Sequence, residues 1–492
     1  MRKQIGVLAG IVTILSACGG GGGGNGGGNT STTPPVTTPT PPPPPPPTST
    51  AGCSLTERQN WAADQLDEFY LFPELLPKNP NPAGYATVQD YIDFLTSKAR
   101  TQHKDRGFTY LTSIEEEDAY YNSGTNAGFG MRLGFTPNNE LLIIEAFEGA
   151  PALAAGIDRG TQILAIGTSE SNLRDVDDII ASSDSGIYDA LGPSDPGVSR
   201  VFRIRSANGA ESIVTVAKTE FELKPVSTRY GAKVINDGGQ KVGYVNLRTF
   251  IGPAETPLKN AFAKFRKQGI TKVVVDLRYN GGGLVSVSEL FGNLLGGSRS
   301  TSDVFSYTTF RPSLASNNDT TYFDPNDQSI GPMKIAFIGT GGTASASELL
   351  MNGFIPYLGA DNALIGTNTF GKPVGQIARD RPQCDDRLRV VAFRTENADH
   401  QGDYYNGLAT VMKTTCVAPD DVSFQLGDPR EASTRQALDF LAGRGTCTPI
   451  AATASGSGLR TQGMTREMAL DQVELMTPPD ASTAQRETPG LF

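Results

Sequence analysis

Three apolar runs in the second half of the chain each end in a turn built largely from small residues. The runs cover residues 272–278, 335–338 and 363–366, and stretches with helical spacing of apolar residues, 253–268 and 284–295, flank the first of them. Alternating buried strands and helices predict an α/β core. Because ligands of an open α/β sheet bind at strand ends, the three turns can converge on one site.

The middle turn carries a serine. Residues 342–348 read Gly-Thr-Ala-Ser-Ala-Ser-Glu, and Ser345 falls in the first turn of the helix expected after them. Backbone N–H groups and the dipole at a helix start can stabilise an oxyanion on a carbonyl that Ser345 attacks. Alternatively, Ser345 and Glu348 form only a Ser-x-x-Glu capping box that begins the helix.

A serine that attacks an amide needs a base, and the third turn offers a lysine. No motif places either histidine, His103 or His400, beside the serine. Lys372 can serve if burial and a nearby helix end lower its pKa from the ordinary value of about 10.4. Gln376, four residues later, can orient the amine. The alternative for Lys372 is a solvated surface lysine.

Together the three turns resemble the motifs of the C-terminal processing peptidases, which are serine endopeptidases. The matching segments are Asp276-Leu277-Arg278-x-Asn280-x-Gly282-Gly283, Thr343-Ala344-Ser345-Ala346-Ser347-Glu348 and Thr369-Phe370-Gly371-Lys372. The resemblance covers roughly residues 55–448. It implies a multidomain α/β protein, with a crotonase- or Clp-like protease core preceded by a small helical unit and a PDZ-like β domain.

The resemblance also implies roles for single residues. Ser345 corresponds to the nucleophile, Lys372 to the general base and Gln376 to the residue that orients the base. The implied oxyanion hole consists of backbone N–H groups, those of Ala346 and of Gly282 or Gly283. Ser347 is the competing nucleophile, and Ser345 is preferred because the family's reactive serine is the earlier of the two.

The chain departs from the family pattern in four places, one of which is a slightly long linking stretch, residues 354–358. Gly281 stands where proline is usual, and Pro373 where glycine is common. The helix after Ser345 offers no acidic residue that matches the one important in some members. These differences bear on efficiency and substrate range more than on the reaction.

Residues 118–222 resemble a PDZ domain. A glycine-bearing loop enters a strand, a short helix follows Pro151, and another strand follows Gly160. PDZ domains bind an extended peptide along a strand edge and hold its C-terminal carboxylate with loop N–H groups. The loop residues implied here are Gly128, Phe129, Gly130 and Met131. The alternative is a generic small β domain with a glycine-rich turn.

The remaining globular segments are a helical N-terminal unit, 53–117, and the peptidase core, 223–448. Ser54-x-x-Glu57 and Thr87-x-x-Asp90 predict the starts of two helices in the N-terminal unit. Residues 449–492 are expected to be a low-complexity, loosely attached tail, with a helix around residues 464–476.

The first residues resemble a bacterial lipoprotein signal peptide. Residues 1–17 combine two basic residues with a short apolar segment, and Leu-Ser-Ala precedes Cys18. This pattern implies lipidation of Cys18, and Gly19 after it favours the outer membrane, on its periplasmic or surface-exposed face. An ordinary secretory signal is the alternative. Residues 18–52, rich in glycine, proline and threonine, predict a disordered tether that holds the folded part away from the membrane.

Four further cysteines, an even number, are typical of an exported protein with two disulfides. They are Cys53, Cys384, Cys416 and Cys447, which allow three connectivities. The preferred pairing is Cys384 with Cys416, because they bracket a strand-rich stretch, and Cys53 with Cys447. Their spacing is unlike that of a zinc site.

Charge and chemistry restrict the partners. A net charge of −10 and a pI near 5.0 argue against nucleic acid. The sequence therefore predicts an envelope peptidase without metal or cofactor that cleaves proteins with exposed C-terminal segments. The alternatives are a non-catalytic peptide-binding or scaffold protein on the same fold, and an esterase or amidase whose turnover of small esters survives deletion of residues 120–218.

Overall fold

The structure of the protein is a computed structural model, and it describes residues 51–183, 185–451 and 473–492. These residues belong to a single compact unit, Ser49–Phe492. The predicted signal peptide, the lipidation site Cys18 and the tether up to residue 50 lie outside the described residues.

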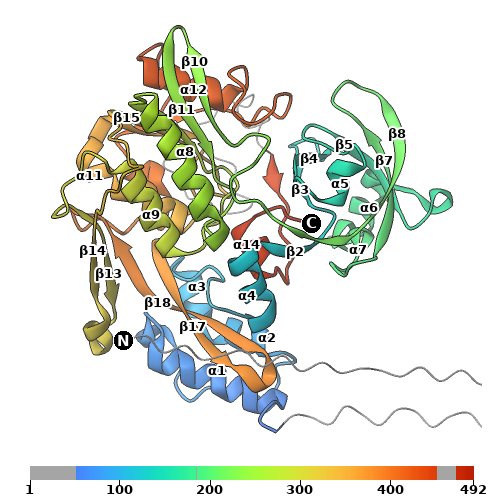
Figure 1. Cartoon of the computed structure of the whole chain (residues 1–492). Helices are drawn as coiled ribbons and strands as arrows, with labels where there is room; N and C mark the ends of the chain where they lie inside the picture. Colours follow the sequence, from blue (N-terminus) through green and yellow to red (C-terminus); the bar gives the residue numbers. More distant parts are fainter. Residues whose placement is uncertain (1–50, 184, 452–472) are drawn as a thin grey trace, which may run out of the picture. The chain divides into compact units, whose positions relative to one another are not determined.

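A six-stranded sheet forms the centre of the peptidase core (Figure 1). Its order is β10(Ala232–Asp237), β11(Gln240–Asn246), β12(Lys272–Asp276), β15(Lys334–Gly339), β16(Asn362–Gly366) and β19(Thr414–Val417). Strands β11 to β19 run parallel, whereas β10 is antiparallel to β11. The three predicted apolar runs are β12, β15 and β16, which are neighbours in the sheet. Strands covered on both faces read as continuous apolar runs, so the prediction of an α/β core is confirmed.

Helices cover both faces of this sheet. α8(Glu255–Lys267), α9(Val285–Leu295) and α10(Ala346–Gly353) share one core with Val273 and Val275, and α11(Ile355–Leu358) follows them. α12(Ala432–Ala442) packs against Val274 on the other face. Because successive strand residues point to opposite faces, one apolar run serves both cores.

A second sheet joins the N-terminal unit to the core. It contains β1(Tyr110–Ser113), β18(Asp386–Glu396), β13(Val304–Phe310) and β14(Asp319–Tyr322) in that order, with β17(Val374–Arg381) paired to β18. α1(Leu55–Phe69) and α2(Val88–Leu95) pack on β18, and α3(Ser97–Thr101) follows. Both predicted capping boxes form at the starts of α1 and α2. α4(Ile114–Ser123) then leads out of this unit.

The PDZ-like segment contains a seven-stranded sheet. The order is β20(Glu474–Leu475), β3(Met131–Phe135), β4(Leu141–Ala146), β5(Gln162–Gly167), β7(Ser199–Arg205) and β8(Glu211–Ala217), with β6(Arg174–Asp175) beside β5. Its helices are α5(Pro151–Ala154), α6(Val176–Ser182) and α7(Gly186–Leu191), while β2(Thr125–Gly128) pairs with β9(Thr219–Glu222). The expected succession of loop, strand, short helix and strand is present, while the PDZ assignment itself stays a prediction.

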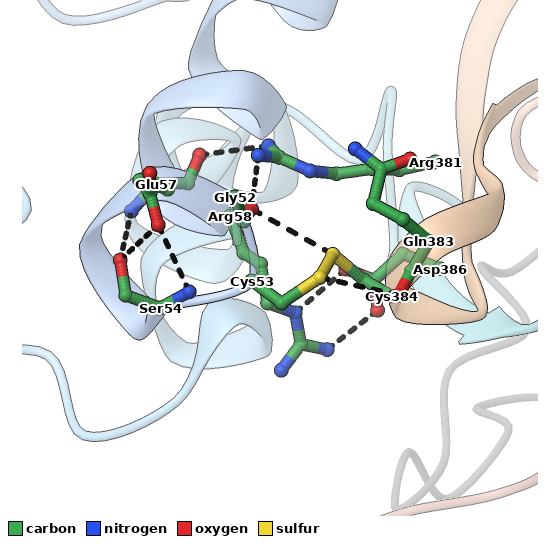
Figure 2. Close-up of a disulfide and its surroundings, with 9 residues drawn as sticks. All are labelled: Gly52, Cys53, Ser54, Glu57, Arg58, Arg381, Gln383, Cys384 and Asp386. Atoms are coloured by element: carbon green, nitrogen blue, oxygen red, sulfur yellow. Dashed lines mark hydrogen bonds and ion pairs between the residues drawn. A yellow bond between two sulfur atoms is a disulfide. The ribbon is translucent and has the colours of Figure 1, made fainter. Parts of the chain in front are cut away.

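The disulfide pairing predicted from the sequence is wrong. Cys53 bonds to Cys384, as Figure 2 shows, and Cys416 bonds to Cys447. Cys384 lies in the turn between β17 and β18, against the start of α1, where Arg58 also binds Asp386 at 2.6 Å. Cys416 instead lies inside β19 of the core sheet. The predicted partner of Cys384 was wrong because Cys384 lies in a turn of the second sheet, whereas Cys416 belongs to the core sheet.

The expectation of a loosely attached tail is also wrong for residues 473–492. Strand β20 pairs with β3. In the last helix, α14(Thr483–Glu487), residues Thr483, Ala484 and Glu487 are buried. The helix expected around residues 464–476 does not extend over Glu474–Leu475, which form a strand. Residues 464–472 lie outside the described part of the chain.

Candidate active site

Ser345 lies at the sharp turn between β15 and α10. Its backbone has φ 56° and ψ −116°, a conformation that costs energy for a residue with a side chain and is common at functional turns. The side chain is partly exposed. Ser347, the competing candidate, is fully buried, and its hydroxyl donates to the carbonyl of Asn280 at 3.0 Å. The geometry leaves Ser345 as the serine that a substrate can reach.

Glu348 joins the serine turn to the lysine turn. Its carboxylate accepts hydrogen bonds from the backbone N–H of Ser345 at 3.0 Å, Gly371 at 2.7 Å and Lys372 at 2.8 Å, and from the Thr369 hydroxyl at 2.6 Å. Burial raises the pKa of Glu348, although these donors oppose the rise. The sequence interpretation gave Glu348 a capping role alone, since the lysine turn is twenty or so residues away and nothing local indicates the contact.

Lys372 is buried, with 8 % of its surface exposed. Its amine donates to Gln376 Oε1 at 2.7 Å and lies 5.1 Å from the centre of the Phe108 ring. Burial lowers the pKa of Lys372, because an ammonium loses hydration there. The surface-lysine alternative is therefore wrong, and the amine is placed where a neutral base can form.

The N-terminal unit supplies support for this lysine that the sequence did not reveal. Gln376 Nε2 donates to the carbonyl of Phe108, and Arg106 donates to the carbonyls of Phe370 and Gly371. The Arg106 guanidinium also stacks 4.1 Å from the Phe370 ring centre. No motif marks Arg106 and Phe108, so only their position in the fold indicates this role.

The glycine turn after β12 lies against Ser345. A Cβ on Gly282 would stand 2.8 Å from the Cβ of Ser345, and Gly282 has φ 123°, so glycine is required on both counts. The N–H of Gly282 donates to Asn280 Oδ1 at 3.0 Å. Within residues 51–183, 185–451 and 473–492, the N–H groups of Gly283 and Ala346 have no hydrogen-bond acceptor. Two of the three predicted oxyanion donors are thus available.

The glycine-bearing loop of the PDZ-like segment, residues 128–131, is occupied by the chain's own last residue. The N–H groups of Gly130 and Met131 donate to the backbone oxygen of Phe492 at 2.9 and 3.1 Å. The backbone of Gly128 packs against the backbone of Phe492, and the side chain of Phe129 is buried in the domain core. This loop does not join the serine and lysine turns.

The same C-terminal segment reaches the candidate catalytic turns. The N–H of Gly281 donates to the carbonyl of Glu487 at 2.9 Å, and the Glu487 side chain is buried. The charge of Glu487 raises the pKa of Lys372, against the effect of burial. The sequence gave no indication of this contact.

Comparison with known proteins identifies the core. Residues 241–406 match Peptidase family S41, and this range includes the serine, lysine and glycine turns. A carboxyl-terminal-processing protease of Picosynechococcus is 28% identical over 65% of this chain and 71% of its own length. One from Synechocystis is 27% identical over 65% and 70%. The core is thus a Peptidase family S41 domain, similar to those of carboxyl-terminal-processing proteases.

A solved structure agrees with this family's fold. A Bacteroides fragilis protein named as an S41 protease superposes with a TM-score of 0.62 at 21% identity, covering 78% of this chain and 97% of its own.

Of the helices in the described part, none is long and apolar enough to cross a membrane. Nor does the described part contain a group of three or more His, Cys, Asp or Glu side chains placed to hold a metal ion.

Proposed function

We propose that this peptidase is a serine endopeptidase that uses a Ser345–Lys372 dyad. The observation that carries the proposal is the Glu348 carboxylate, which binds backbone N–H groups of both the serine turn and the lysine turn. The match of residues 241–406 to Peptidase family S41 supports the reaction class. The buried Lys372 supplies the base and the partly exposed Ser345 the nucleophile.

The reaction begins with proton transfer. Neutral Lys372 takes the proton of Ser345 Oγ as that oxygen bonds to the carbonyl carbon of a peptide bond. The N–H groups of Gly283 and Ala346 stabilise the oxyanion that forms. Lys372 then protonates the leaving amine, and the peptide bond breaks to give an acyl ester on Ser345. Water, deprotonated by Lys372, hydrolyses the ester and restores the serine. Gln376 orients the amine throughout.

The substrate and the location are part of the same proposal. The protein binds unstructured C-terminal segments of proteins along β3 of the PDZ-like domain and presents them to Ser345. A lipid on Cys18 anchors it in the cell envelope, with residues 18–52 as a spacer. What supports the location is the sequence pattern of residues 1–52.

The test compares cleavage of casein by the full-length protein and its variants. Ser345→Ala and Lys372→Ala are expected to lower the rate by about three orders of magnitude or more, because each removes one partner of the nucleophile–base pair. Ser347→Ala is the matched control and is expected to keep most activity. Loss of cleavage in Ser347→Ala with retention in Ser345→Ala would contradict the assignment. Mass spectrometry of the products then gives the cleavage sites.

A further inference from the structure

The last twenty residues of the chain occupy the edge of β3, where a peptide ligand would add a strand. β20 pairs antiparallel with β3, with Glu474 opposite Phe135 and Leu475 opposite Gly134. The chain then leaves the sheet and returns, so that Leu491 lies opposite Arg132 in an antiparallel bridge. The N–H of Leu133 donates to the Gly490 carbonyl at 2.8 Å. The whole edge of β3 is therefore paired.

Phe492 fills the end of this edge. Its N–H donates to the carbonyl of Met131 at 2.9 Å, while its own oxygen accepts from Gly130 and Met131. A Cβ on Gly128 would stand 2.8 Å from the backbone carbon of Phe492, so only glycine admits the residue here. The Phe492 side chain is buried in the apolar core of the domain, 5.9 Å from the ring of Tyr188. An apolar aromatic residue fits this end of the edge.

Between the two paired stretches, α14 covers the glycine turn of the candidate active site. A Cβ on Gly281 would lie 2.3 Å from the Arg486 carbonyl, and one on Gly282 would lie 3.1 Å from Glu487 Oε2. Among the described residues, that oxygen has no hydrogen-bond partner although it is buried. The segment thus lies on the same glycine that contacts Ser345.

Polar contacts hold α14 in place without a covalent link. Thr488 shares a hydrogen bond with the Tyr120 hydroxyl at 3.1 Å, and the Thr483 hydroxyl donates to Glu117 at 3.0 Å. Arg132, a buried residue of β3, donates to the carbonyl of Pro489. These contacts, like the packing of Leu491, are non-covalent, so a peptide that pairs with β3 can compete with the segment.

We propose that residues 474–492 are a built-in peptide ligand that occupies the β3 edge and covers the candidate catalytic turn until a substrate peptide displaces it. The competing ligand is an extended peptide whose main chain pairs with β3 and whose last residue is aromatic or similarly apolar. The inference that the segment inhibits cleavage rests on the proposed function, whereas the inference that it competes with peptides for β3 does not.

The first arm of the test measures binding. A fluorescein-labelled peptide of residues 481–492 is titrated with the full-length chain, with the chain ended after residue 472, and with full-length Phe492→Asp, using fluorescence anisotropy. The two altered chains are expected to bind at least tenfold more tightly than the unaltered chain. A peptide carrying Phe492→Asp is the matched control and is expected to bind each chain at least tenfold more weakly. Equal binding by all three chains, or binding by none, overturns the proposal. The full-length Phe492→Asp variant provides the test even if the shortened chain does not fold.

The second arm measures casein cleavage by the same chains. The shortened chain and Phe492→Asp are expected to cut at least tenfold faster, and Ser345→Ala in the shortened chain is expected to abolish the gain. If no chain cuts while the binding result holds, the proposed peptidase function fails but the ligand inference stands. If all chains cut at one rate, the segment does not cover the site and the inference is overturned.

Discussion

The N-terminal unit and the C-terminal segment both influence Lys372, but they do so by different means. The N-terminal unit supports the lysine, because the Phe108 carbonyl holds Gln376 and Arg106 holds the turn that carries Lys372. The C-terminal segment places Glu487 near the amine, and its charge favours the protonated form. The charge of Arg486, in the same segment, lowers the pKa of Lys372, and that of Asp105 in the N-terminal unit raises it. The N-terminal unit thus orients the amine through hydrogen bonds, whereas the C-terminal segment acts on it through charge alone.

The two segments are also attached to the rest of the protein differently, one by a covalent bond and the other without one. A disulfide between Cys53 and Cys384 fixes the N-terminal unit to the β17–β18 turn. Hydrogen bonds and apolar packing, including that of Leu491 and Phe492, hold the described C-terminal residues, 473–492. A covalent bond suits a part that must stay in place, and hydrogen bonds suit a part that a competing peptide replaces.

The largest expected effect is the loss of stability on removing the Cys53–Cys384 disulfide. Replacing both Cys53 and Cys384 by alanine is expected to lower the free energy of unfolding by about 4–5 kcal/mol, because the bond closes a long loop in the unfolded chain. The sequence separation is 331, against 31 for Cys416 and Cys447. The loss should exceed that of the Cys416/Cys447 double variant by about 2 kcal/mol. Urea unfolding followed by fluorescence of Trp61, the single tryptophan, which lies in α1, measures both. Equal losses would contradict the loop argument.

The second largest effect is expected from removing Gln376, which links the Lys372 amine to the N-terminal unit. Gln376→Ala is expected to lower kcat by about 100-fold with little change in KM, because the amine of Lys372 loses its orientation while the peptide edge is untouched. The shortened chain ending at residue 472 is the background for this assay. Gln102→Ala, at an exposed position of the same unit, serves as the control. A rise in KM with unchanged kcat would assign Gln376 to binding instead.

A cluster of three charged side chains links the PDZ-like segment to the core. Asp420 binds Arg159 of the PDZ-like segment at 2.8 Å and Arg278 of the core at 3.2 Å. Burial disfavours the charge of Asp420, but these two arginines hold its pKa down to about 2, below the ordinary 3.8.

A depressed carboxyl pKa contributes stability above pH 3.8 that is lost as the pH falls through about 2. The contribution is about 2 kcal/mol. Urea unfolding at pH 5 and pH 2 should therefore show a smaller pH-dependent loss in Asp420→Asn, which is already destabilised at pH 5. The exposed Asp327→Asn is the control. A pH response like that of the unaltered chain would show that Asp420 is not the group responsible.

The smallest effect concerns the charge at the C-terminal end. Glu487 raises the pKa of Lys372, so Glu487→Gln should let the amine lose its proton at lower pH. The rising limb of the plot of kcat/KM against pH is therefore expected to shift to lower pH. Glu474→Gln removes an exposed charge from the same segment and should leave the limb in place. A shift in the opposite direction would exclude Glu487 as a partner of Lys372.

The peptidase core shows how far local patterns lead. The apolar runs 272–278, 335–338 and 363–366 predicted three strands that are adjacent in the sheet, and parallel strands bring their ends to one edge. The capping boxes at Ser54 and Thr87 were confirmed for the same reason, since a helix start depends on residues three positions apart.

The errors concern contacts between distant residues. The disulfide partners, the packing of residues 473–492 and the link from Glu348 to Lys372 join segments that no periodicity or spacing connects. Each depends on which surfaces meet once the sheets have formed.

The sequence by itself therefore determined the strands, the helix starts and the residue types of the candidate dyad, because these are set by neighbours along the chain. Only the tertiary structure decided that the N-terminal unit supports Lys372 and that the C-terminal segment covers the glycine turn. The physical reason is that such contacts follow from packing between remote segments, whose energy has no counterpart in the local sequence.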